Sequence, residues 1–447
     1  MPGDVFAATG NQAKSKKERL RHGYEQRKQL GRSKLDIAPR RKRGSNPLQL
    51  LHAAAKGRIP GLLLLKYKRM SASAFAFFRG SVPIMAADLA GQPHTGITVQ
   101  LCGDAHVQNL GCYSAPDGRL VFDLNDFDET IAGPWEWDVK RMAASIVLAG
   151  QEADGNQAAC EGSVESFADS YCTTIEALAE EPVLTAARHI IHRVKSAKAV
   201  SAAWQQAERA QPLDLLKRYT EGNDEEHIRF RHIEGQLWRL RSERRQKVLA
   251  ALESYRQSLP PERIHLFNFF HPIDVAFKVV GTGSVGLRDY VVLMIGNGRD
   301  DPLFLQLKQE VNSAYESYLK QNLYKHQGQR VVEGQHKIQP LSDLLLGWTS
   351  IDGKDFLVRQ LNDHKATVDL KSLRGDGLSS LAVIAGELLA RGHARSGDAL
   401  EVKGYIGSCG KVVKAITKYA MDYAELTQAD FHAFQKAIGA GQFKVAA

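Results

Sequence analysis

The chain has 447 residues, of which 43% are hydrophobic and 24% are charged, a composition typical of a globular protein with room for more than one hydrophobic core. No apolar run approaches the roughly 20 residues of a membrane-spanning helix, and the five cysteines include no CxxC pair, so a membrane protein, a disulfide framework and a structural zinc site are not expected. The N-terminus lacks the apolar core of a signal peptide, and we expect a cytoplasmic location.

Positive charge is concentrated in residues 1–45. This segment contains 13 Lys and Arg residues against 4 Asp and Glu, whereas the other residues contain 46 of each. We expect the basic tail to be poorly ordered. Its RRKR run at 40–43 suits a weak contact with nucleic acid or another polyanion. A solvated leader is the favoured alternative, because the only aromatic residues of the tail are Phe6 and Tyr24.

The next part of the chain has a mainly helical pattern. The stretch SASAFAFFRGSVPIMAADLA at 71–90 favours a helix whose aromatic residues are buried, which leaves Arg79 to find an anion. Short strands are expected at 98–101 and 119–124, with APDG as a turn signal near them. A long exposed helix is expected at 229–259, where charged residues are dense.

The hydrophobic period then changes. Residues 274–310 contain strand-like apolar runs separated by two Gly-containing turns, GTGSVG and GNGRDD, and predict three strands. One helix is expected at 309–324, and two further strands at 330–338 and 355–361. From about Leu373 the pattern is helical again. This order of elements predicts an α+β fold.

An acidic stretch, LCGDAHVQNLGCYSAPDGRLVFDLNDFDET, covers residues 101–130. Two carboxylates ~4 Å apart repel by about 4 kcal/mol at an effective dielectric constant near 20, so such a cluster needs protonation, solvent or a bound cation. Asp carboxylates and the amide of Asn109 suit Mg²⁺ or Mn²⁺, and zinc is less suited because His106 is the only imidazole in the stretch. The alternative is a solvated acidic loop, which the apolar neighbours argue against: Val121, Phe122, Leu124 and Phe127.

The spacing of Asp104, Asn109 and the NDFD run at 125–128 resembles the catalytic and metal loops of protein-kinase-like phosphotransferases. The likeness is closest to small-molecule kinases such as the aminoglycoside and choline kinases. The resemblance implies that Asp104 orients or deprotonates the attacking hydroxyl, and that Asn109 and Asp126 hold Mg²⁺ on the ATP phosphates. It also assigns His106 to the catalytic group and Asp128 to the metal group.

Two neighbouring features bear on the same resemblance. Cys102 stands where the loops of these kinases have a histidine, so support for the backbone of the loop must come from elsewhere. The segment GPWEWDVKRMAAS at 133–145 resembles the one whose aspartate anchors the catalytic loop from below, and that aspartate is Asp138 here.

The GTGSVG run at 281–286 is by itself a weak signal for a phosphate-binding loop, because glycines also make plain turns. Strands on both sides favour a kinase-like loop over a dinucleotide fold, which would place a helix after the glycines. Lys308 lies on a later strand and resembles the kinase lysine, with Glu316 or, less favoured, Glu310 as its acidic partner. The predicted nucleotide-binding residues are Gly281, Gly283, Ser284, Gly286, Lys308 and Glu316, and Lys308 also joins Asp104 and His106 as a catalytic residue.

These elements follow the catalytic loop by about 180 residues, whereas in ordinary kinases they precede it. We therefore expect a two-lobe, protein-kinase-like α+β fold that is circularly permuted. The helix at 386–398 would bring His393, Arg395 and Asp398 near the site. The expected regions are a basic tail (1–45), a mostly helical lobe with the catalytic and metal loops (46–270), a small β-rich nucleotide-binding lobe (271–370) and a helical C-terminal part that packs on the large lobe (371–447).

From about Tyr67 onward the chain also resembles an uncharacterised bacterial family, domain-of-unknown-function family 2252, through motifs that include LCGDAHVQNLG, FDLNDFDET and HARSGD. That family implies no substrate. The expected function is an ATP- and Mg²⁺-dependent phosphotransferase acting on the hydroxyl of an unknown small-molecule or protein acceptor. Two alternatives stay open: a nucleotide-binding pseudokinase or scaffold without turnover, and a metal-dependent phosphoesterase.

Overall fold

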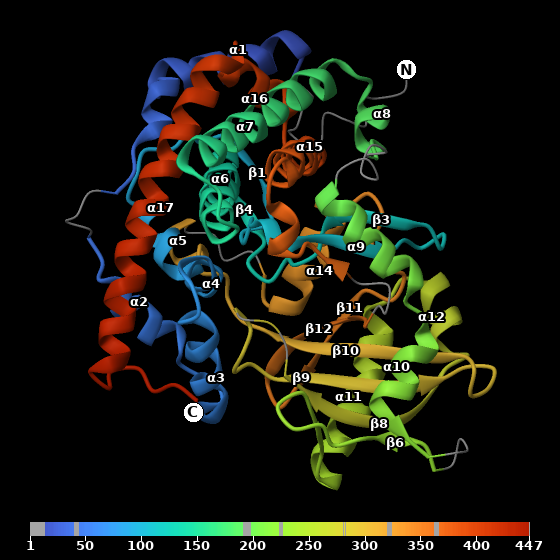
Figure 1. Ribbon diagram of the computed structural model, residues 1–447. Coiled ribbons are helices and arrows are strands. Elements are labelled where there is room, and N and C mark those ends of the chain that lie inside the picture. The colour runs from blue at the N-terminus through green and yellow to red at the C-terminus, as the bar shows by residue number, and fades with distance from the viewer. Residues whose placement is uncertain are drawn as a thin grey trace, which may run out of the picture.

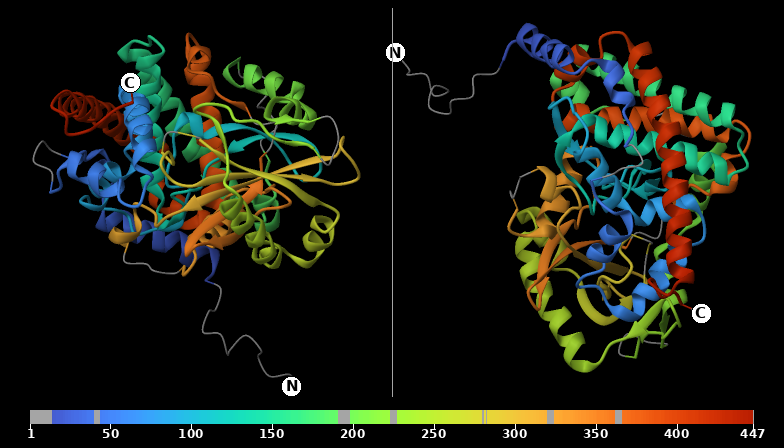
Figure 2. Two further views of the ribbon diagram at one scale, coloured as in Figure 1. Left: turned by 90° about the horizontal axis from the view of Figure 1, so that it is seen from below. Right: turned by 90° about the vertical axis from the view of Figure 1, so that its left-hand side faces the viewer.

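The computed structural model describes residues 14–39, 44–190, 198–222, 227–279, 281, 283–319, 324–361 and 366–446. The described chain forms a mixed α+β fold with antiparallel sheets. Long helices occupy the upper part of Figure 1, and a six-stranded sheet occupies the lower part. Figure 2 shows the same arrangement from below and from the left-hand side. Within the described ranges, we find no helix whose length and apolar character would let it cross a membrane.

Long helices build most of the upper part: α6 (Trp135–Glu152), α7 (Gln157–Glu180), α15 (Gly377–Ser396), α16 (Ala399–Ile406) and α17 (Cys409–Gly439). Every residue of α6 from Trp135 to Gly150 is buried, so this helix forms the centre of the main hydrophobic core. Helix α15 packs closely on α7 because Gly386 has no side chain; a Cβ there would lie 2.5 Å from the carbonyl oxygen of Phe167. Helix α17 runs down the left side of the molecule in Figure 1.

The tail was expected to be poorly ordered, and this expectation is wrong for its residues 14–39. Helix α1 (Lys16–Gln29) packs on α16, and Gly23 is buried at this contact. The contact requires glycine, because a side chain at this position would overlap the backbone oxygen of Glu401. In the 3₁₀ helix that follows (Arg32–Asp36), Leu35 is fully buried in the main core. Tertiary packing therefore stabilises a charged helix of low intrinsic amphipathicity. The RRKR run lies outside the described residues.

Short helices and strands connect the two parts: α2 (Pro47–Ala54), α3 (Pro60–Met70), α4 (Ala74–Gly80), α5 (Val82–Ala90), β1 (Thr98–Leu101), β2 (Leu110–Ser114), β3 (Leu120–Leu124), β4 (Ile131–Pro134) and β13 (Ala366–Thr367). Strand β1 pairs with β4, and β2 pairs with β3 in a hairpin that β13 extends. Because the β2–β3 pair is nested between the two strands of the β1–β4 pair, the loop from β1 to β2 lies beside the loop from β3 to β4. The first loop contains a 3₁₀ helix (Val107–Asn109).

The lower sheet is antiparallel, with strand order β11-β12-β10-β9-β8-β7. Its strands are β7 (Leu237–Arg239), β8 (His271–Lys278), β9 (Asp289–Ile295), β10 (Pro302–Glu310), β11 (Gly347–Ile351) and β12 (Lys354–Gln360). Helices α11 (Ser242–Ser258) and α12 (Pro261–Phe267) pack against one face, where Tyr255 lies in one core with Val292 and Leu307. Helix α10 (Pro212–Tyr219) and the pair β5 (Thr220–Glu221) and β6 (Arg229–Phe230) pack on the other face. The three strands predicted within 274–310 are confirmed.

Helix α14 (Gln327–Ile338) lies between the sheet and the upper part in Figure 1, where a strand was predicted at 330–338. Val331 and Val332 favour a strand locally, but the helix buries both of them. Gly334 lets the helix approach Thr130, since a Cβ there would overlap the Thr130 side chain. Tertiary packing therefore overrides the local β propensity, and the strand prediction is wrong.

Two helix predictions are also wrong. Residues 229–259 begin as β6 and β7, because these short strands pair with β5 and β8, and the chain becomes helical only at α11. At 309–324, strand β10 continues to Glu310 through its pairing with β12, and the described helix is confined to α13 (Glu316–Leu319). The other helices are α8 (Val183–Ala187), α9 (Lys198–Arg209) and a 3₁₀ helix (Leu370–Leu373).

Candidate functional site

The loop that carries Asp104 follows β1 and is held from below by α6. The backbone N–H groups of Cys102 and Gly103 donate to the two carboxylate oxygens of Asp138, at 2.7 and 3.0 Å. Gly103 has φ +82°, a backbone conformation that would be strained in a residue with a side chain. The anchoring role predicted for Asp138 is therefore confirmed.

Further support for this loop comes from α15 and from the segment before α13. His393 Nε2 lies 3.4 Å from Asp138 Oδ2, and its Nδ1 is 2.8 Å from the hydroxyl of Tyr171. The hydroxyl of Tyr315 donates to the carbonyl oxygen of Gly103 at 2.8 Å. These side chains support the backbone of the loop, which Cys102 was not expected to do. One of them, His393, contributes an imidazole from a distant part of the chain.

The other two residues expected on the same helix do not reach the site. Asp398 caps α16 and pairs with Arg19 of α1 at 2.6 Å. Arg395 donates to the carbonyl oxygens of Ala187 and Gln339. Of the three residues, only His393 contacts Asp138, which anchors the loop of Asp104. One face of α15 points toward α6, and the helix ends before Asp398.

Asp104 has a partner that the sequence analysis missed. Arg141 of α6 is fully buried and donates to Asp104 Oδ1 from Nε at 2.9 Å and from Nη2 at 2.5 Å. The available signal was helical spacing: Arg141 follows Asp138 by three residues, so both side chains lie on the same face of α6. A two-nitrogen contact of this kind fixes the orientation of the carboxylate.

His106 lies beside Asp104 with its Nε2 3.7 Å from Asp104 Oδ2. Burial lowers the pKa of His106 to about 4, despite the opposing effect of the Asp104 charge. The imidazole is therefore neutral at neutral pH.

Asn109 joins the two acidic loops. Its Nδ2 donates to the carbonyl oxygens of Asp104 and Asp126, at 3.1 and 2.9 Å, and its Oδ1 accepts from the N–H groups of Asn125 and Asp126, at 3.2 and 2.6 Å. The side-chain oxygen thus uses both of its acceptor positions on backbone groups. A metal-ligand role for Asn109 stays a prediction, and it would require this oxygen to give up a backbone contact.

Lys308 of β10 meets the acidic run that follows β3. Its Nζ lies 3.2 Å from Asp126 Oδ1 and 2.5 Å from Asp128 Oδ2. Burial disfavours the charged form of Lys308, but the carboxylates of Asp126, Asp128 and Glu310 outweigh it and raise the lysine pKa. Burial and the nearby Asp126 charge raise the pKa of Asp128 to about 7. Residues separated by 180 or more positions thus form one charge cluster.

The acidic partner predicted for Lys308 is corrected by these contacts. Glu316 lies on α13 and borders a separate small cavity with Arg330 and Lys337. Glu310, the second choice, lines the main cavity, and its buried Oε1 has no hydrogen-bond partner among the described residues. Burial raises the pKa of Glu310 well above its usual value. Strand β10 continues to Glu310 in place of the expected helix, which explains why Glu316 does not face Lys308.

The glycine-rich loop connects β8 to β9 as a strand–turn–strand. Gly281 and Gly286 have φ values of +70° and +96°, a region where glycine is favoured. The carbonyl oxygen of Gly283 accepts from Lys66 Nζ at 2.8 Å and from Arg58 Nη1 at 2.9 Å. Basic side chains that precede Asp104 in the chain therefore hold the loop over the site.

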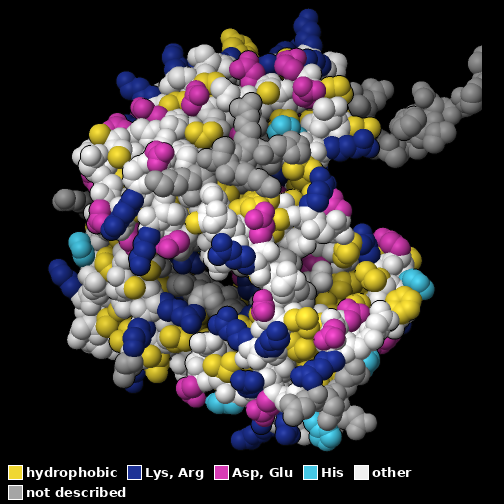
Figure 3. Space-filling model, turned by 45° about the vertical axis from the view of Figure 1, so that its right-hand side comes forward, with side chains coloured by type: hydrophobic (Ala, Val, Ile, Leu, Met, Phe, Trp, Pro, Cys, Tyr) yellow, Lys and Arg dark blue, Asp and Glu magenta, His cyan; other side chains and the backbone are white. Residues whose placement is uncertain are grey.

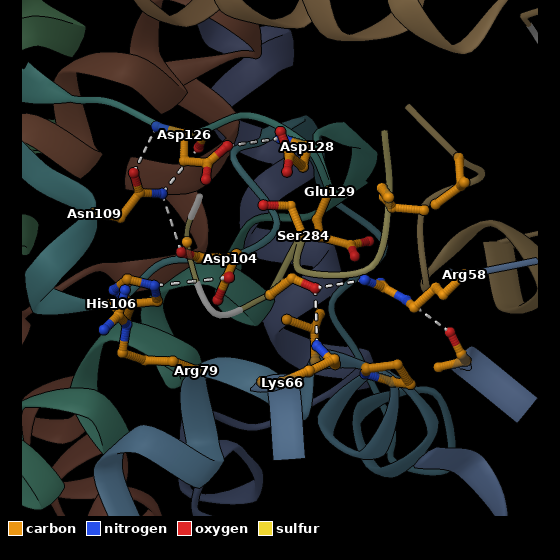
Figure 4. Close-up of a pocket in the computed structure, with 18 of the residues that line it drawn as sticks. Arg58, Lys66, Arg79, Asp104, His106, Asn109, Asp126, Asp128, Glu129 and Ser284 are labelled. Carbon is orange, nitrogen blue, oxygen red and sulfur yellow. Dashed lines mark hydrogen bonds and ion pairs between the residues drawn. The ribbon is translucent and has the colours of Figure 1, made fainter. Parts of the chain in front are cut away.

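A cavity of about 270 Å³ unites most of these groups. Figure 4 shows this cavity in close-up, with lining residues such as Asp104 and Asp126 labelled. The predicted site residues that line it are Asp104, His106, Asn109, Asp126, Asp128, Gly281, Gly283 and Ser284. Lys308 and Gly286 border a smaller cavity that shares Ser284 with the main one. Three basic residues also line the main cavity: Arg58, Lys66 and Arg79.

Figure 3 shows one face of the molecule, where Lys and Arg side chains gather around a hollow near its middle.

Residues 58–437 match the model of one protein family, described as "Uncharacterized protein conserved in bacteria (DUF2252)". No curated protein and no solved structure gives a significant match to the chain.

Proposed function

This chain belongs to the DUF2252 family of bacterial proteins, and we propose from the geometry of its cavity that it is an ATP- and Mg²⁺-dependent phosphotransferase of the kinase-like type that acts on an acceptor hydroxyl. One observation carries the proposal: Lys308 reaches Asp126 and Asp128 beside the cavity that also holds Asp104 and the glycine-rich loop. This combination of a lysine, acidic groups and a glycine-rich loop is the one that protein kinases use for phosphoryl transfer.

The fold of this enzyme, in our proposal, is a circularly permuted kinase-like fold with two lobes. Protein kinases cover the phosphates with a glycine-rich loop and place the lysine on the third strand. Counted from β8, which precedes the glycine-rich loop here, β10 is the third strand and carries Lys308. The loops of Asp104 and Asp126 precede these strands in the chain, and the cavity unites both sets.

The acidic residues fit a magnesium ion that is shared with nucleotide phosphates. Mg²⁺ at such sites uses one or two carboxylates together with the phosphates, and Asp126, 47% exposed, lines the cavity next to Asp128. Burial, and after it the charge of Asp126, raise the pKa of Asp128 although Lys308 lies beside it. Mg²⁺, or Mn²⁺, would neutralise charge on the phosphates. Lys308 would then leave the carboxylates and bind phosphate oxygens.

Asp104 would receive the acceptor hydroxyl. Arg141 fixes the orientation of its carboxylate, and Asp138 fixes the backbone beneath it. Because Arg141 holds Oδ1, the second oxygen, Oδ2, remains to accept a hydrogen bond from the hydroxyl. The neutral His106 beside Oδ2 adds a polar group without adding charge. Positioning of this kind accounts for most of the catalysis in phosphoryl transfer.

A nucleotide-binding protein without turnover is the second candidate, and the contacts of Asn109 favour it. Its oxygen is occupied by two backbone N–H groups, so one predicted metal ligand is engaged elsewhere. For the metal-dependent phosphoesterase, no group of three or more His, Cys, Asp or Glu in the described ranges is arranged to hold a metal ion. A magnesium ion shared with phosphates does not require such a group.

The experiment measures nucleotide binding and turnover in four proteins. Wild type should bind ATP with Mg²⁺ more tightly than ATP alone, by calorimetry. Asp126→Asn should lose this dependence on Mg²⁺, because one carboxylate is removed from the shared site. Asp104→Asn should keep the binding and lose about 10²–10⁴-fold in transfer of label from γ-labelled ATP. Asp117→Asn, at an exposed hairpin turn, is the matched control and should resemble wild type.

Three results would count against the proposal. If wild type does not bind ATP with Mg²⁺, the nucleotide site is wrong. If Asp126→Asn binds as wild type does, the metal lies elsewhere. If wild type binds ATP with Mg²⁺ but transfers no label to an acceptor, to water or to itself, a nucleotide-binding protein without turnover becomes the better explanation.

A further inference from the structure

The basic residues that line the main cavity come from one short segment of the chain. Arg58 lies between α2 and α3, Lys66 lies on α3, and Arg79 lies in the last turn of α4. In Figure 4, Asp104 lies between Arg79 and Lys66 below it and Asp126 and Asp128 above it, whereas Arg58 lies on the right, beyond Ser284. The cavity therefore has acidic groups suited to a metal and phosphates, and basic groups both beyond Asp104 and beside the glycine-rich loop.

Burial lowers the pKa of both Arg58 and Arg79, and the carboxylates near them, first Asp104 for Arg79 and Glu129 for Arg58, offset this effect only in part. Arg58 donates to the backbone oxygens of Ala54, Gly283 and Val285. Arg79 donates to the side-chain amide oxygen of Gln108 at 2.6 Å, and its buried Nε has no hydrogen-bond partner. In the part of the chain that the structure describes, neither arginine forms an ion pair with a carboxylate.

Arg141 provides the contrast within the same site, because it pairs directly with Asp104. A cationic side chain that is removed from water without a counter-charge is costly. Guanidinium groups bind phosphate and carboxylate through two parallel hydrogen bonds. Arg58 and Arg79 therefore line the cavity with positive charge that a bound anion would balance.

The position of Arg79 relates this charge to the acceptor. Its partner Gln108 belongs to the loop of Asp104, four residues further along the chain. The contact thus holds the guanidinium at a fixed place relative to the carboxylate that receives the acceptor hydroxyl. An anionic group bound there would belong to the same molecule as that hydroxyl.

We propose, resting on the phosphotransferase function above, that the acceptor is an anionic small molecule: Arg79 binds its phosphate or carboxylate group, while its hydroxyl lies at Asp104. In the transfer, the hydroxyl oxygen forms a bond to the γ-phosphorus of ATP and the bond from that phosphorus to the bridging oxygen of ADP breaks. The hydroxyl proton passes to Asp104 and then to solvent. The products are the phosphorylated acceptor, ADP and one proton.

This assignment departs from the kinases that the sequence resembles most. Choline and the aminoglycosides are cations, and an acceptor site for them needs negative charge. In our assignment the group of the acceptor that is not phosphorylated lies at Arg79, so the charge of the acceptor is reversed although the loop of Asp104 is similar.

The test uses the full-length protein saturated with Mg²⁺ and a non-hydrolysable ATP analogue, which fills the γ-phosphate position. Inorganic phosphate, acetate and choline are then titrated by calorimetry. Phosphate or acetate should bind, which distinguishes a phosphorylated from a carboxylated acceptor, and choline should not. Arg79→Gln should lower the affinity for the anion by about 10- to 100-fold. It should leave the affinity for the ATP analogue within about twofold of that of wild type. Arg79→Lys should retain part of the anion affinity, and Arg119→Gln, at an exposed turn, should change neither.

A second readout follows transfer itself. A pool of small metabolites is separated by charge before reaction, and label from γ-labelled ATP should enter the anionic fraction in wild type and much less in Arg79→Gln. Binding of choline in place of the anions, or labelling confined to the cationic fraction, overturns the acceptor assignment. An Arg79→Gln variant that loses the analogue but keeps the anion also overturns it, because the arginine then serves the nucleotide. Failure of the analogue to bind wild type overturns the phosphotransferase function itself, and the acceptor assignment with it.

Discussion

At the scale of single residues, Asp138 holds the backbone of the loop that carries Asp104. It is fully buried on α6 and accepts the backbone N–H groups of Cys102 and Gly103, and His393 contacts the same carboxylate. In the kinases that this loop resembles, a histidine begins the loop. Here a cysteine stands at that place, and an imidazole near the C-terminal end of α15 approaches the anchoring aspartate instead.

Asp138→Ala should destabilise the fold and loosen this loop. Two hydrogen bonds to a charged acceptor are lost, each contributing about 1.5–3 kcal/mol, and two buried N–H groups are left without a partner. We expect the free energy of unfolding, measured with urea, to fall by about 3 kcal/mol or more. Amide hydrogen exchange at Cys102 and Gly103 should become faster. Asp117→Ala serves as the control, and equal stability of the two variants would contradict the anchoring role.

Helix α6 shows at the scale of an element how much charge this core contains. Its ionisable residues Glu136, Asp138, Lys140 and Arg141 are all buried. Each has a partner from another element: Thr95 binds Glu136, Gln92 binds Lys140, and Asp104 binds Arg141. Helix α6 therefore positions the site through polar contacts while its apolar residues fill the core.

The buried Lys140 predicts a dependence of stability on pH. Burial lowers its pKa from 10.5 to about 8. Between these values the unfolded chain holds a proton that the folded protein has released, so raising the pH over this interval stabilises the fold. Below pH 8 both states are protonated and the cost of burying the charge is present in full.

Lys140→Met should remove this contribution. Relative to the variant, wild type should gain up to about 3 kcal/mol in free energy of unfolding as the pH rises from 8 to 10.5, measured by urea denaturation at several pH values. The exposed Lys411→Met is the control and should follow wild type. A difference between wild type and Lys140→Met that stays constant across this interval would mean that Lys140 titrates normally.

The distribution of charge is a property of the whole molecule. All of the net charge of +9 resides in residues 1–45, since the rest of the chain is balanced. Part of that segment, including α1, packs on the helical part, so deletion of all 45 residues would expose the surface of α16. A test of polyanion binding must therefore change charge without removing the helix.

Replacing the four basic residues at 40–43 by Gln provides that test. If this run binds a polyanion, retention on a heparin column should fall steeply with salt for wild type and should be weaker for the variant at every salt concentration. The melting temperature should be the same in both. Equal retention of the two proteins would assign the basic run to solubility alone.

Much of the site was predictable because its chemistry is local in the sequence. Asp104, Asn109 and Asp126 lie within one stretch of 30 residues, and the glycine-rich loop lies between strands whose apolar runs are continuous. Arg141 was missed because its three-residue spacing from Asp138 places both on one face of a helix but does not say which group that face meets. The helix at 330–338 was missed because its valines favour a strand, and only contact with Thr130 and β12 decides for the helix.

By itself, the sequence determined which residue types are available for chemistry and where most strands and C-terminal helices lie, because hydrophobic period and motif spacing act over a few residues. Only the tertiary structure decided which of these residues meet. The pairing of Lys308 with Asp126 and Asp128, the support of Asp138 by His393, and the contact of Arg58 with Gly283 all join segments far apart in the chain. Such contacts depend on how helices and sheet pack, and packing is a sum over the whole core that no local pattern contains.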